Sequence, residues 1–292
     1  MGAVEDYAAM VAAVDSQKER LHGPPRPDIW GGVTAKRFRA DPKREMDDNF
    51  QTRASFVRLD DIFVDAGGGA GRLGLPMALR CREVINVDSS PGMGQEFLGS
   101  ASEAGIASAR FVQYDWLDPD GAPYAVEGDV VHAANVTYFV RDIERFVRNL
   151  EAAARRRVII TVWSVPNPMH SATLFKMVYG ETQAVVPGYT HLLPALWEIG
   201  ILPDVRFLPQ LTTIDGVIQP PVFPQSKEDA IGMALEGRWL APQHRGRGEA
   251  VVTEHFEELF QEGPEGFVPQ WIPDAHEVLM TWETGQQGDN KG

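Results

Sequence analysis

The sequence predicts an α/β protein built on a mostly parallel β-sheet with helices on both faces. Three observations lead to this prediction: short apolar runs rich in β-branched residues recur between residues 62 and 163, amphipathic stretches separate these runs, and a glycine-rich turn follows the first of them. Neighbouring parallel strands need crossover connections, which helices supply in this pattern. A parallel sheet of this kind is covered on both faces.

One strand is expected for each apolar run. These strands span residues 62–64, 84–87, 109–114, 129–133 and 158–163. The clearest helix between them is expected at 142–154, because its apolar residues recur at the spacing of one helix face. Two further strands are expected, one at 204–208 and one at 276–283, where apolar residues alternate with others.

Segments on either side of this pattern are expected to be mainly helical. Residues 1–57 are expected to form a helical segment that packs on the core, beginning with a helix over residues 1–20 whose apolar positions share one face. After the fifth strand, helices are expected at 171–178 and at 190–199, the second of which ends at Gly200.

An insertion is expected at about residues 216–269, between the last two strands. Its first helix begins at Ser226, which has the spacing of a capping box with Asp229, and its second helix spans 249–261. Together with the N-terminal segment, this insertion would form a helical lid. The polar tail, residues 285–292, is expected to be disordered.

Composition limits the classes of protein to which the chain can belong. Of its 292 residues, 43% are hydrophobic and 23% are charged, so the chain can bury a sizeable core in one large domain or two small ones. There are 27 Lys and Arg residues against 41 Asp and Glu residues, which gives a net charge of −14. This acidic balance argues against nucleic acid as a partner.

Neither a membrane span nor a metal centre is expected. No apolar run approaches the ~20 residues that cross a bilayer, and Glu5 and Asp6 lie where a secretory signal would carry basic residues. The single cysteine, Cys81, excludes an internal disulfide framework and fits a reducing, cytoplasmic location. The sequence has no HExxH motif, no paired cysteines and no acidic loop at calcium spacing.

The glycine-rich turn at residues 64–74, VDAGGGAGRLG, is the most informative segment of the chain. It lies between a strand and a helix, where backbone N–H groups and the helix dipole face a ligand. Glycines there let a ligand approach the backbone. Gly69, Gly71 and Gly74 fit the GxGxxG pattern of dinucleotide sites, and Asp88 after the next strand could bind a ribose.

The same turn also fits a second pattern, in which an acid precedes three alternating glycines. These residues are Asp65, Gly67, Gly69 and Gly71. An acid at the end of the strand suits a ligand with a cationic amino group and repels a pyrophosphate. In this motif the chain resembles the class I methyltransferases that use S-adenosylmethionine. The resemblance covers roughly residues 58–165 and implies a Rossmann-like, seven-stranded sheet in a domain spanning residues 58–284.

The resemblance assigns roles to residues at the ends of successive strands. It implies that Asp65 and the glycine loop hold the amino acid part of the cofactor, that Asp88 accepts both ribose hydroxyls, and that Asp115 contacts the adenine amino group. Trp116 lies beside Asp115, and Met93 matches an apolar position against the adenine ring. These residues are expected at one edge of the sheet, where ligands bind in open α/β folds.

Candidate residues for the acceptor side follow the fourth and fifth strands. The resemblance implies that Asn135 contacts the cofactor and lies, with Tyr138, near the transferring methyl group. His170 and His191 are candidate general bases for an acceptor that needs one, whereas His132, inside a strand, is expected to be buried and hydrogen-bonded. Methyl transfer is an in-line displacement, so positioning alone can supply much of the catalysis.

The sequence therefore indicates a cytoplasmic methyltransferase that uses S-adenosylmethionine on a small-molecule acceptor, as a monomer or homodimer. Two alternatives stay open: an NAD(P)- or flavin-dependent oxidoreductase that uses Gly69, Gly71 and Gly74, and a non-catalytic protein that binds S-adenosylmethionine. The oxidoreductase alternative leaves Asp65 and Asp115 without a role.

Overall fold

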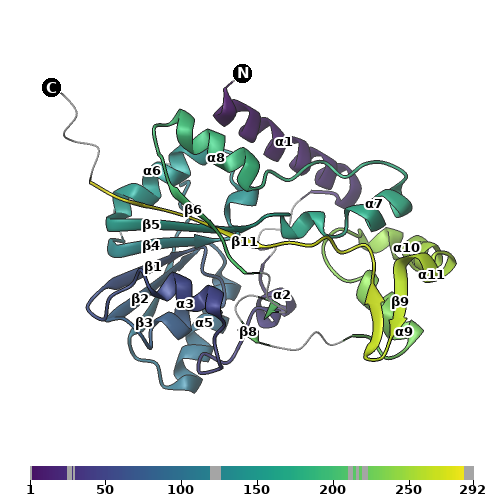
Figure 1. Cartoon of the computed structure of the whole chain (residues 1–292), viewed down its shortest axis with the longest axis horizontal. Coiled ribbons are helices and arrows are strands. Elements are labelled where there is room, and N and C mark those ends of the chain that lie inside the picture. Colours follow the sequence, from purple (N-terminus) through teal and green to yellow (C-terminus); the bar gives the residue numbers. More distant parts are fainter. Residues whose placement is uncertain are drawn as a thin grey trace.

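The computed structural model describes residues 2–24, 28, 30–118, 126–209, 213–214, 217–218 and 223–285. A seven-stranded sheet forms its centre. The strands are β1 (Ile62–Ala66), β2 (Glu83–Asp88), β3 (Ala109–Gln113), β4 (Gly128–Ala134), β5 (Ala154–Trp163), β6 (Asp204–Phe207) and β11 (Glu277–Glu283). They lie in the order β3-β2-β1-β4-β5-β11-β6, with β11 antiparallel to both neighbours and the other pairs parallel (Figure 1). The expected Rossmann-like, seven-stranded, mostly parallel sheet is confirmed.

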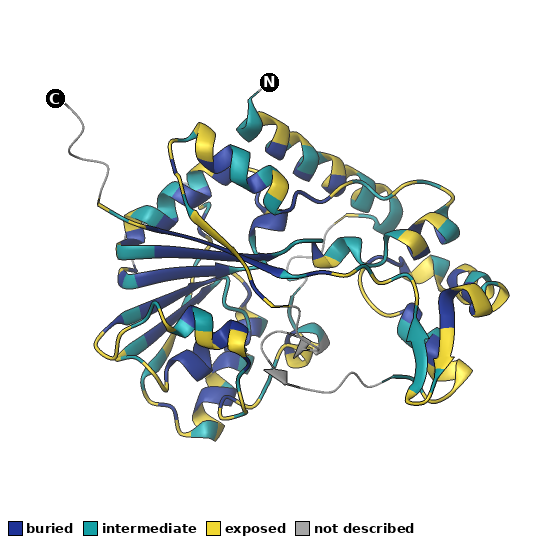
Figure 2. Cartoon of the chain, in the orientation of Figure 1, coloured by how far each residue is buried: buried dark blue, intermediate teal, exposed yellow. Residues whose placement is uncertain are grey.

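Apolar side chains alternate along the central strands and contribute to two cores, one on each face of the sheet. Phe63 and Val130 pack into one core, whereas Val64 and Val131, their neighbours in sequence, pack into the other. The central strands are buried along most of their length (Figure 2). Burial on both faces explains why these strands are near-continuous apolar runs in the sequence.

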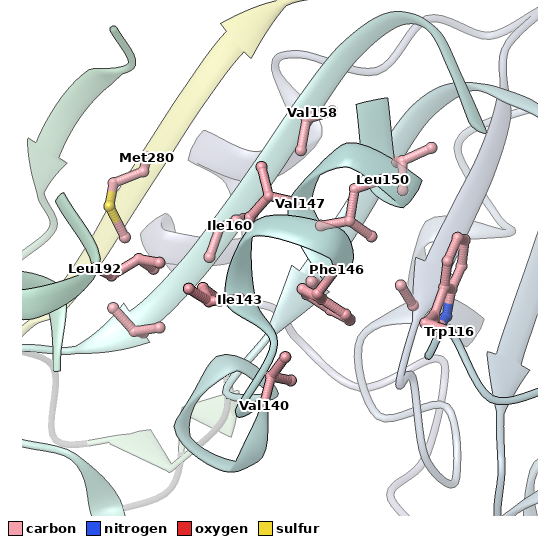
Figure 3. Packing of buried hydrophobic residues seen from close by; sticks show 14 of the residues in the cluster. Trp116, Val140, Ile143, Phe146, Val147, Leu150, Val158, Ile160, Leu192 and Met280 are labelled. Atoms are coloured by element: carbon pink, nitrogen blue, oxygen red, sulfur yellow. The ribbon is translucent and has the colours of Figure 1, made fainter. Parts of the chain in front are cut away.

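Three helices cover one face of the sheet: α6 (Ile143–Ala153), α8 (Tyr189–Glu198) and α1 (Ala3–His22). The side chain of Asp142 caps α6 and accepts a hydrogen bond from the Arg145 N–H. Val147 and Leu150 point from α6 into the core beside β5 (Figure 3). Helix α1 contacts α6 and α8, and its Tyr7 is fully buried, so the N-terminal helix belongs to this layer.

The opposite face carries α3 (Asp48–Ala54), α4 (Gly74–Met77) and α5 (Pro91–Ala104). Helices α3 and α5 begin at side-chain caps, Asp47 and Ser90, each of which accepts a hydrogen bond from a backbone N–H of the first turn. Phe50, Met77 and Phe97 from the three helices fill the core against the strands.

A third cluster of apolar side chains lies beside the sheet and joins α7 (Ala172–Tyr179) to the insertion. The short strand β7 (Thr213–Ile214) precedes the insertion. The described elements of the insertion are β8 (Val217–Ile218), α9 (Lys227–Ala234), the 3-10 helix η3 (Pro242–His244), α10 (Arg245–Glu254), α11 (Phe256–Leu259), β9 (Phe260–Gly263) and β10 (Gly266–Pro269). Helices are present in both places where the sequence led us to expect them, as α9 and as α10 with α11, whereas the β-hairpin of β9 and β10 was not expected.

The expected second helix, 249–261, ends early because of aromatic packing. Phe260 leaves the helical path after Leu259, stacks on Phe256 with 4.8 Å between ring centroids, and meets Trp271 edge-on at 4.9 Å. Trp271 lies outside the expected helix, so the helical periodicity of the sequence does not indicate its contact with Phe260.

The remaining short elements are α2 (Val33–Arg37) and the 3-10 helices η1 (Thr137–Phe139) and η2 (Asn167–Met169). The expected disordered tail, 285–292, lies outside the described residues apart from residue 285. In the described ranges, no helix is both long and apolar enough to cross a membrane.

Candidate functional site

A cavity of about 660 Å³ lies at the carboxyl ends of β1, β2 and β4. In open α/β sheets this edge is where ligands bind, and the volume suits a small molecule. The wall includes the loops after these strands, and it also includes residues of α1, of the segment 30–38 and of the insertion near residue 238. The cavity therefore connects the predicted cofactor loops with the N-terminal segment and the insertion.

The glycine loop lines one end of the cavity with a backbone that favours glycine. Gly67, Gly69 and Gly71 have φ of 71°, 55° and 84°, which is the left-handed region. A Cβ at Gly67 would lie 2.6 Å from the side chain of Val136, and one at Gly71 would lie 2.5 Å from the ring of Phe97. Gly67 and Gly69 face the cavity, while Gly71 lets the loop pack against α5.

Three buried polar side chains lie beneath this loop. The strand register places Asp65 of β1 between Asn86 of β2 and His132 of β4. The Asn86 amide donates to the Gly69 carbonyl at 2.8 Å, and Nδ1 of His132 donates to the Asp65 carboxylate at 3.0 Å. The Thr161 hydroxyl lies 3.4 Å from the other ring nitrogen. The expectation that His132 is buried and hydrogen-bonded is confirmed.

The pairing of Asp65 with His132 was not predicted. Asp65 lines the cavity, but its side chain is only 3% exposed, and one carboxylate oxygen is bonded to the imidazole. The other oxygen lies directly under the loop, 2.6 Å from the place where a Cβ of Gly68 would be. A side chain at residue 68 would therefore clash with this carboxylate, which lies close to the backbone of the loop.

Asp88 presents a carboxylate to the cavity at the end of β2. One oxygen accepts the Gly69 N–H at 3.0 Å, and the other accepts the Ser90 N–H at 2.8 Å. Burial raises the pKa of this carboxyl, and the two backbone hydrogen bonds oppose the shift. Each oxygen keeps acceptor capacity, so Asp88 can accept hydrogen bonds from two hydroxyl groups of a ligand.

The wall beside Asp88 contains Met93, Asp115 and Trp116, as the sequence led us to expect. Met93 and Trp116 are buried, whereas Asp115 is exposed and holds its own turn by accepting the Leu117 N–H at 3.0 Å. The indole N–H of Trp116 is buried without a hydrogen-bond partner in the described part of the chain. An apolar wall with carboxylates at its ends suits a flat, polar-edged ring.

Asn135, at the end of β4, has φ of 58°, the only non-glycine residue of the described chain with a positive φ. Asparagine tolerates this region better than most residues. Its side-chain oxygen accepts the Tyr138 hydroxyl at 3.1 Å, and that hydroxyl accepts the Trp163 N–H at 2.6 Å. Burial raises the pKa of Tyr138, so the phenol stays neutral and fixes the loop.

Comparisons with known proteins support the architecture. No family model matches the sequence. The YcgJ protein of Bacillus subtilis has a similar structure (TM-score 0.50, 14% identity, covering 80% of this chain and 97% of that one). So does a putative methyltransferase from Bacillus halodurans (TM-score 0.50, 12% identity, covering 80% and 96%). The chain shares the Rossmann-like fold of these two proteins.

Other proteins with this fold catalyse different reactions. The [4+2]-cyclase SpnF is also similar (TM-score 0.51, 12% identity, covering 96% of this chain and 94% of that one). An uncharacterized protein of Haemophilus influenzae is 27% identical over 157 residues, which are 53% of this chain and 56% of that protein. The match thus spans about half the length of that relative, and function has to be argued from the site.

The two candidate bases, His170 and His191, are not among the residues that line the cavity. Nε2 of His170 donates to the Val165 carbonyl at 3.0 Å, and burial lowers the pKa of this imidazole. Nδ1 of His191 lies 3.4 Å from the Gly188 N–H, at the start of α8. The fold therefore gives both histidines local structural contacts.

Several residues of the cavity wall come from segments without a motif. Trp30 and Phe38 line the wall. Lys18 of α1 and Arg238 of the insertion lie in the same wall. They are 220 positions apart in the sequence, and no local pattern indicates that they meet.

Proposed function

We propose that the chain is a methyltransferase that uses S-adenosylmethionine to methylate a small-molecule acceptor. The observation that carries this proposal is the carboxylate of Asp88, hydrogen-bonded to the glycine loop and facing the cavity at the end of β2. Its place in a class I methyltransferase fold makes it suitable for the ribose hydroxyls of an adenosyl ligand. The net charge of −14 favours a small-molecule acceptor over nucleic acid.

The residues of the cavity fit the parts of this cofactor. Gly67 and Gly69, supported by Asp65, would hold its amino acid part, and Met93 and Asp115 would hold the adenine face and edge. Asn135 would lie near the sulfonium. When bound, the cofactor supplies a methyl group already activated for displacement, so the chain's own residues need to orient the two reactants and exclude water.

The oxidoreductase alternative is weaker because of the sheet order. This order departs from the 3-2-1-4-5-6 order of dinucleotide-binding domains, because antiparallel β11 lies between β5 and β6. Gly74 packs closely against Asp65 and Val84, which suits the third glycine of either motif and does not separate the two readings.

Titration calorimetry with S-adenosylmethionine, S-adenosylhomocysteine and NADH tests the proposal. We expect micromolar binding of the two adenosyl ligands and a loss of about tenfold or more in Asp88→Ala, because a charged acceptor of two hydrogen bonds is removed. The exposed Asp60→Ala is the matched control and should bind normally. Binding of NADH alone would refute the proposal.

The pH dependence of binding gives a second test of Asp88. Its pKa is raised by burial, and only the ionised form accepts both hydroxyls. Affinity for S-adenosylhomocysteine should therefore fall as the pH drops through this raised pKa, at a higher pH than for an ordinary aspartate.

Transfer of a labelled methyl group into a metabolite extract separates an enzyme from a non-catalytic binding protein, which would bind the cofactor and transfer nothing.

A further inference from the structure

Three aromatic rings line one part of the cavity. Phe139 is the last residue of η1, after β4, whereas Trp30 and Phe38 belong to the N-terminal segment. The ring of Trp30 contacts both phenylalanines edge-on, with 6.1 Å between its centroid and that of Phe38 and 5.7 Å between its centroid and that of Phe139. We call Trp30, Phe38 and Phe139 the aromatic wall.

The aromatic wall leaves much of its ring surface uncovered. Phe139 is 42% exposed and Phe38 is 36% exposed, although both line a cavity, whereas Phe63 and Phe97 in the core are 1% and 0% exposed. Apolar surface that gathers in a concave site, and is not scattered singly over the outside, is typical of a ligand-binding pocket. The exposed surface of the two phenylalanines is therefore available to a ligand.

The aromatic wall borders the place proposed for the cofactor. Trp30 packs against Ala70 of the glycine loop and Met93 of α5. Phe139 contacts the ring of Tyr138 edge-on, and the Tyr138 hydroxyl donates to Asn135, which would lie near the sulfonium. A ligand bound against Phe139 would therefore lie beside the methyl group to be transferred.

Two cations of the chain already lie over rings of the aromatic wall. Nζ of Lys18 lies over the Phe139 ring, 5.2 Å from its centroid. The guanidinium of Arg238 lies over the Trp30 ring at 4.5 Å. These side chains make the cation–π contacts that a cationic ligand would make. An aromatic ligand does not compete for them, because aromatic pairs also form through ring edges.

We infer that the acceptor carries a flat aromatic ring and that the aromatic wall selects it. This inference rests on the proposed methyl transfer. The acceptor ring would contact the exposed surface of Phe139 and Phe38. Aromatic pairs gain more than the area they bury, because the faces and edges of the rings carry opposite partial charges. A saturated ring of the same size gains the area alone.

Two probes that differ in the flatness of their rings test the inference. 2-Naphthamide is flat and aromatic, whereas its decahydro analogue has the same carbon skeleton and the same neutral carboxamide on puckered, saturated rings. The saturated probe exposes at least as much apolar surface, so burial alone would not favour the flat one. In calorimetry on the full chain saturated with S-adenosylhomocysteine, 2-naphthamide should bind about fivefold or more tightly than its analogue.

Substitutions connect this preference to the aromatic wall. Phe139→Leu and Phe38→Leu keep an apolar side chain but remove its flat surface, so each should reduce the preference for 2-naphthamide. Phe139→Tyr keeps the ring and should retain the preference. Phe207→Leu is the matched control, because Phe207 is exposed, contacts the Tyr189 ring edge-on and lies outside the cavity wall. Circular dichroism establishes that each variant is folded.

Three results would overturn the inference. The first is equal, weaker or undetectable binding of 2-naphthamide compared with its analogue. The second is a preference that survives in both Phe38→Leu and Phe139→Leu. The third is binding of 2-naphthamide only to the chain without S-adenosylhomocysteine, because the aromatic wall would then hold the adenine ring of the cofactor and not the acceptor.

A different result would overturn the function on which the inference rests. If S-adenosylhomocysteine itself fails to bind, the proposed methyl transfer is wrong. The two probes are then titrated into the unloaded chain and its variants, where the same comparisons decide whether the aromatic wall selects flat rings.

Discussion

Asp65 and His132 form a hydrogen-bonded pair in a fully buried position, at 2% and 1% exposure. A buried carboxylate is costly unless it is bonded, and here the imidazole supplies the bond on one side while the glycine loop lies over the other oxygen. Removal of the ring would leave a charge or a donor unsatisfied beneath the loop. The pair therefore couples the stability of the fold to the shape of the site.

We predict that His132→Ala lowers the free energy of unfolding by about 3 kcal/mol, because it leaves the buried Asp65 carboxylate without its hydrogen-bond donor. His132→Gln, which keeps an N–H donor, should lose less. Urea denaturation followed by circular dichroism measures both changes. His255→Ala, on the surface at an exposed ion pair, is the control and should change stability by less than about 0.5 kcal/mol. Equal losses in His132→Ala and the control would contradict the role given to the pair.

At the scale of elements, α5 shows how one helix supports the site through its glycines. It begins at the Ser90 cap and ends at Gly105 in the left-handed conformation. Within it, a Cβ at Gly94 would lie 2.3 Å from the Phe111 ring, whereas a Cβ at Gly99 would meet nothing within 4 Å. Of these two glycines, only Gly94 is needed for close packing of the helix on β3.

Alanine substitutions at these two glycines of α5 should therefore change the free energy of unfolding in opposite directions. Gly99→Ala should raise the free energy of unfolding by about 0.5 to 1 kcal/mol, because alanine loses less backbone entropy in a helix. Gly94→Ala should lower it by about 1 to 3 kcal/mol, since Phe111 would have to move. Thermal melts of the two variants measure the difference. A stabilising Gly94→Ala would show that the helix can shift away from the strand.

The elements of the central sheet could be predicted because their signal is local. The strands β1, β2, β4 and β5 contain Val and Ile in short apolar runs, and the cap at Ser226 is indicated by its spacing from Asp229. The hairpin of β9 and β10 was missed, because Phe260 is placed by contacts with Trp271 and not by periodicity. Element ends set by distant packing have no local signal.

The residues of the cavity wall also fall into a group that could be predicted from the sequence and a group that could not. Asp88, Asp115 and Asn135 line the cavity as predicted, because residues at the carboxyl ends of parallel strands meet at one edge of the sheet. Lys18 and Arg238 could not be predicted, since their meeting depends on how α1 and the insertion pack.

At the scale of the whole molecule, part of the cavity wall comes from segments that do not belong to the sheet. Trp30 and Ala35 of the N-terminal segment pack against Ala70 of the glycine loop and Met93 of α5. The insertion reaches the same cavity through residues 237–239. A ligand in the cavity would therefore hold three separate parts of the chain together.

Hydrogen–deuterium exchange tests whether a ligand in the cavity holds these three parts of the chain together. Saturation with S-adenosylhomocysteine is expected to slow exchange in residues 30–38 and 236–240 as well as in the glycine loop, because a bound ligand suppresses local opening. Helix α3, which contributes no residue to the cavity wall, is the internal control and should exchange at an unchanged rate. Protection confined to the strand ends would mean that the N-terminal segment and the insertion do not close over the ligand.

The position of β11 has a consequence for synthesis of the chain. It lies inside the sheet, hydrogen-bonded to β5 on one side and β6 on the other, although it is the last of the seven strands to be translated. Until residues 277–283 have left the ribosome, β5 has an unpaired edge and β6 has no partner in the sheet. Ribosomes that stall within the insertion therefore present a nascent chain with an open, apolar strand edge, which is a site for chaperone binding or aggregation.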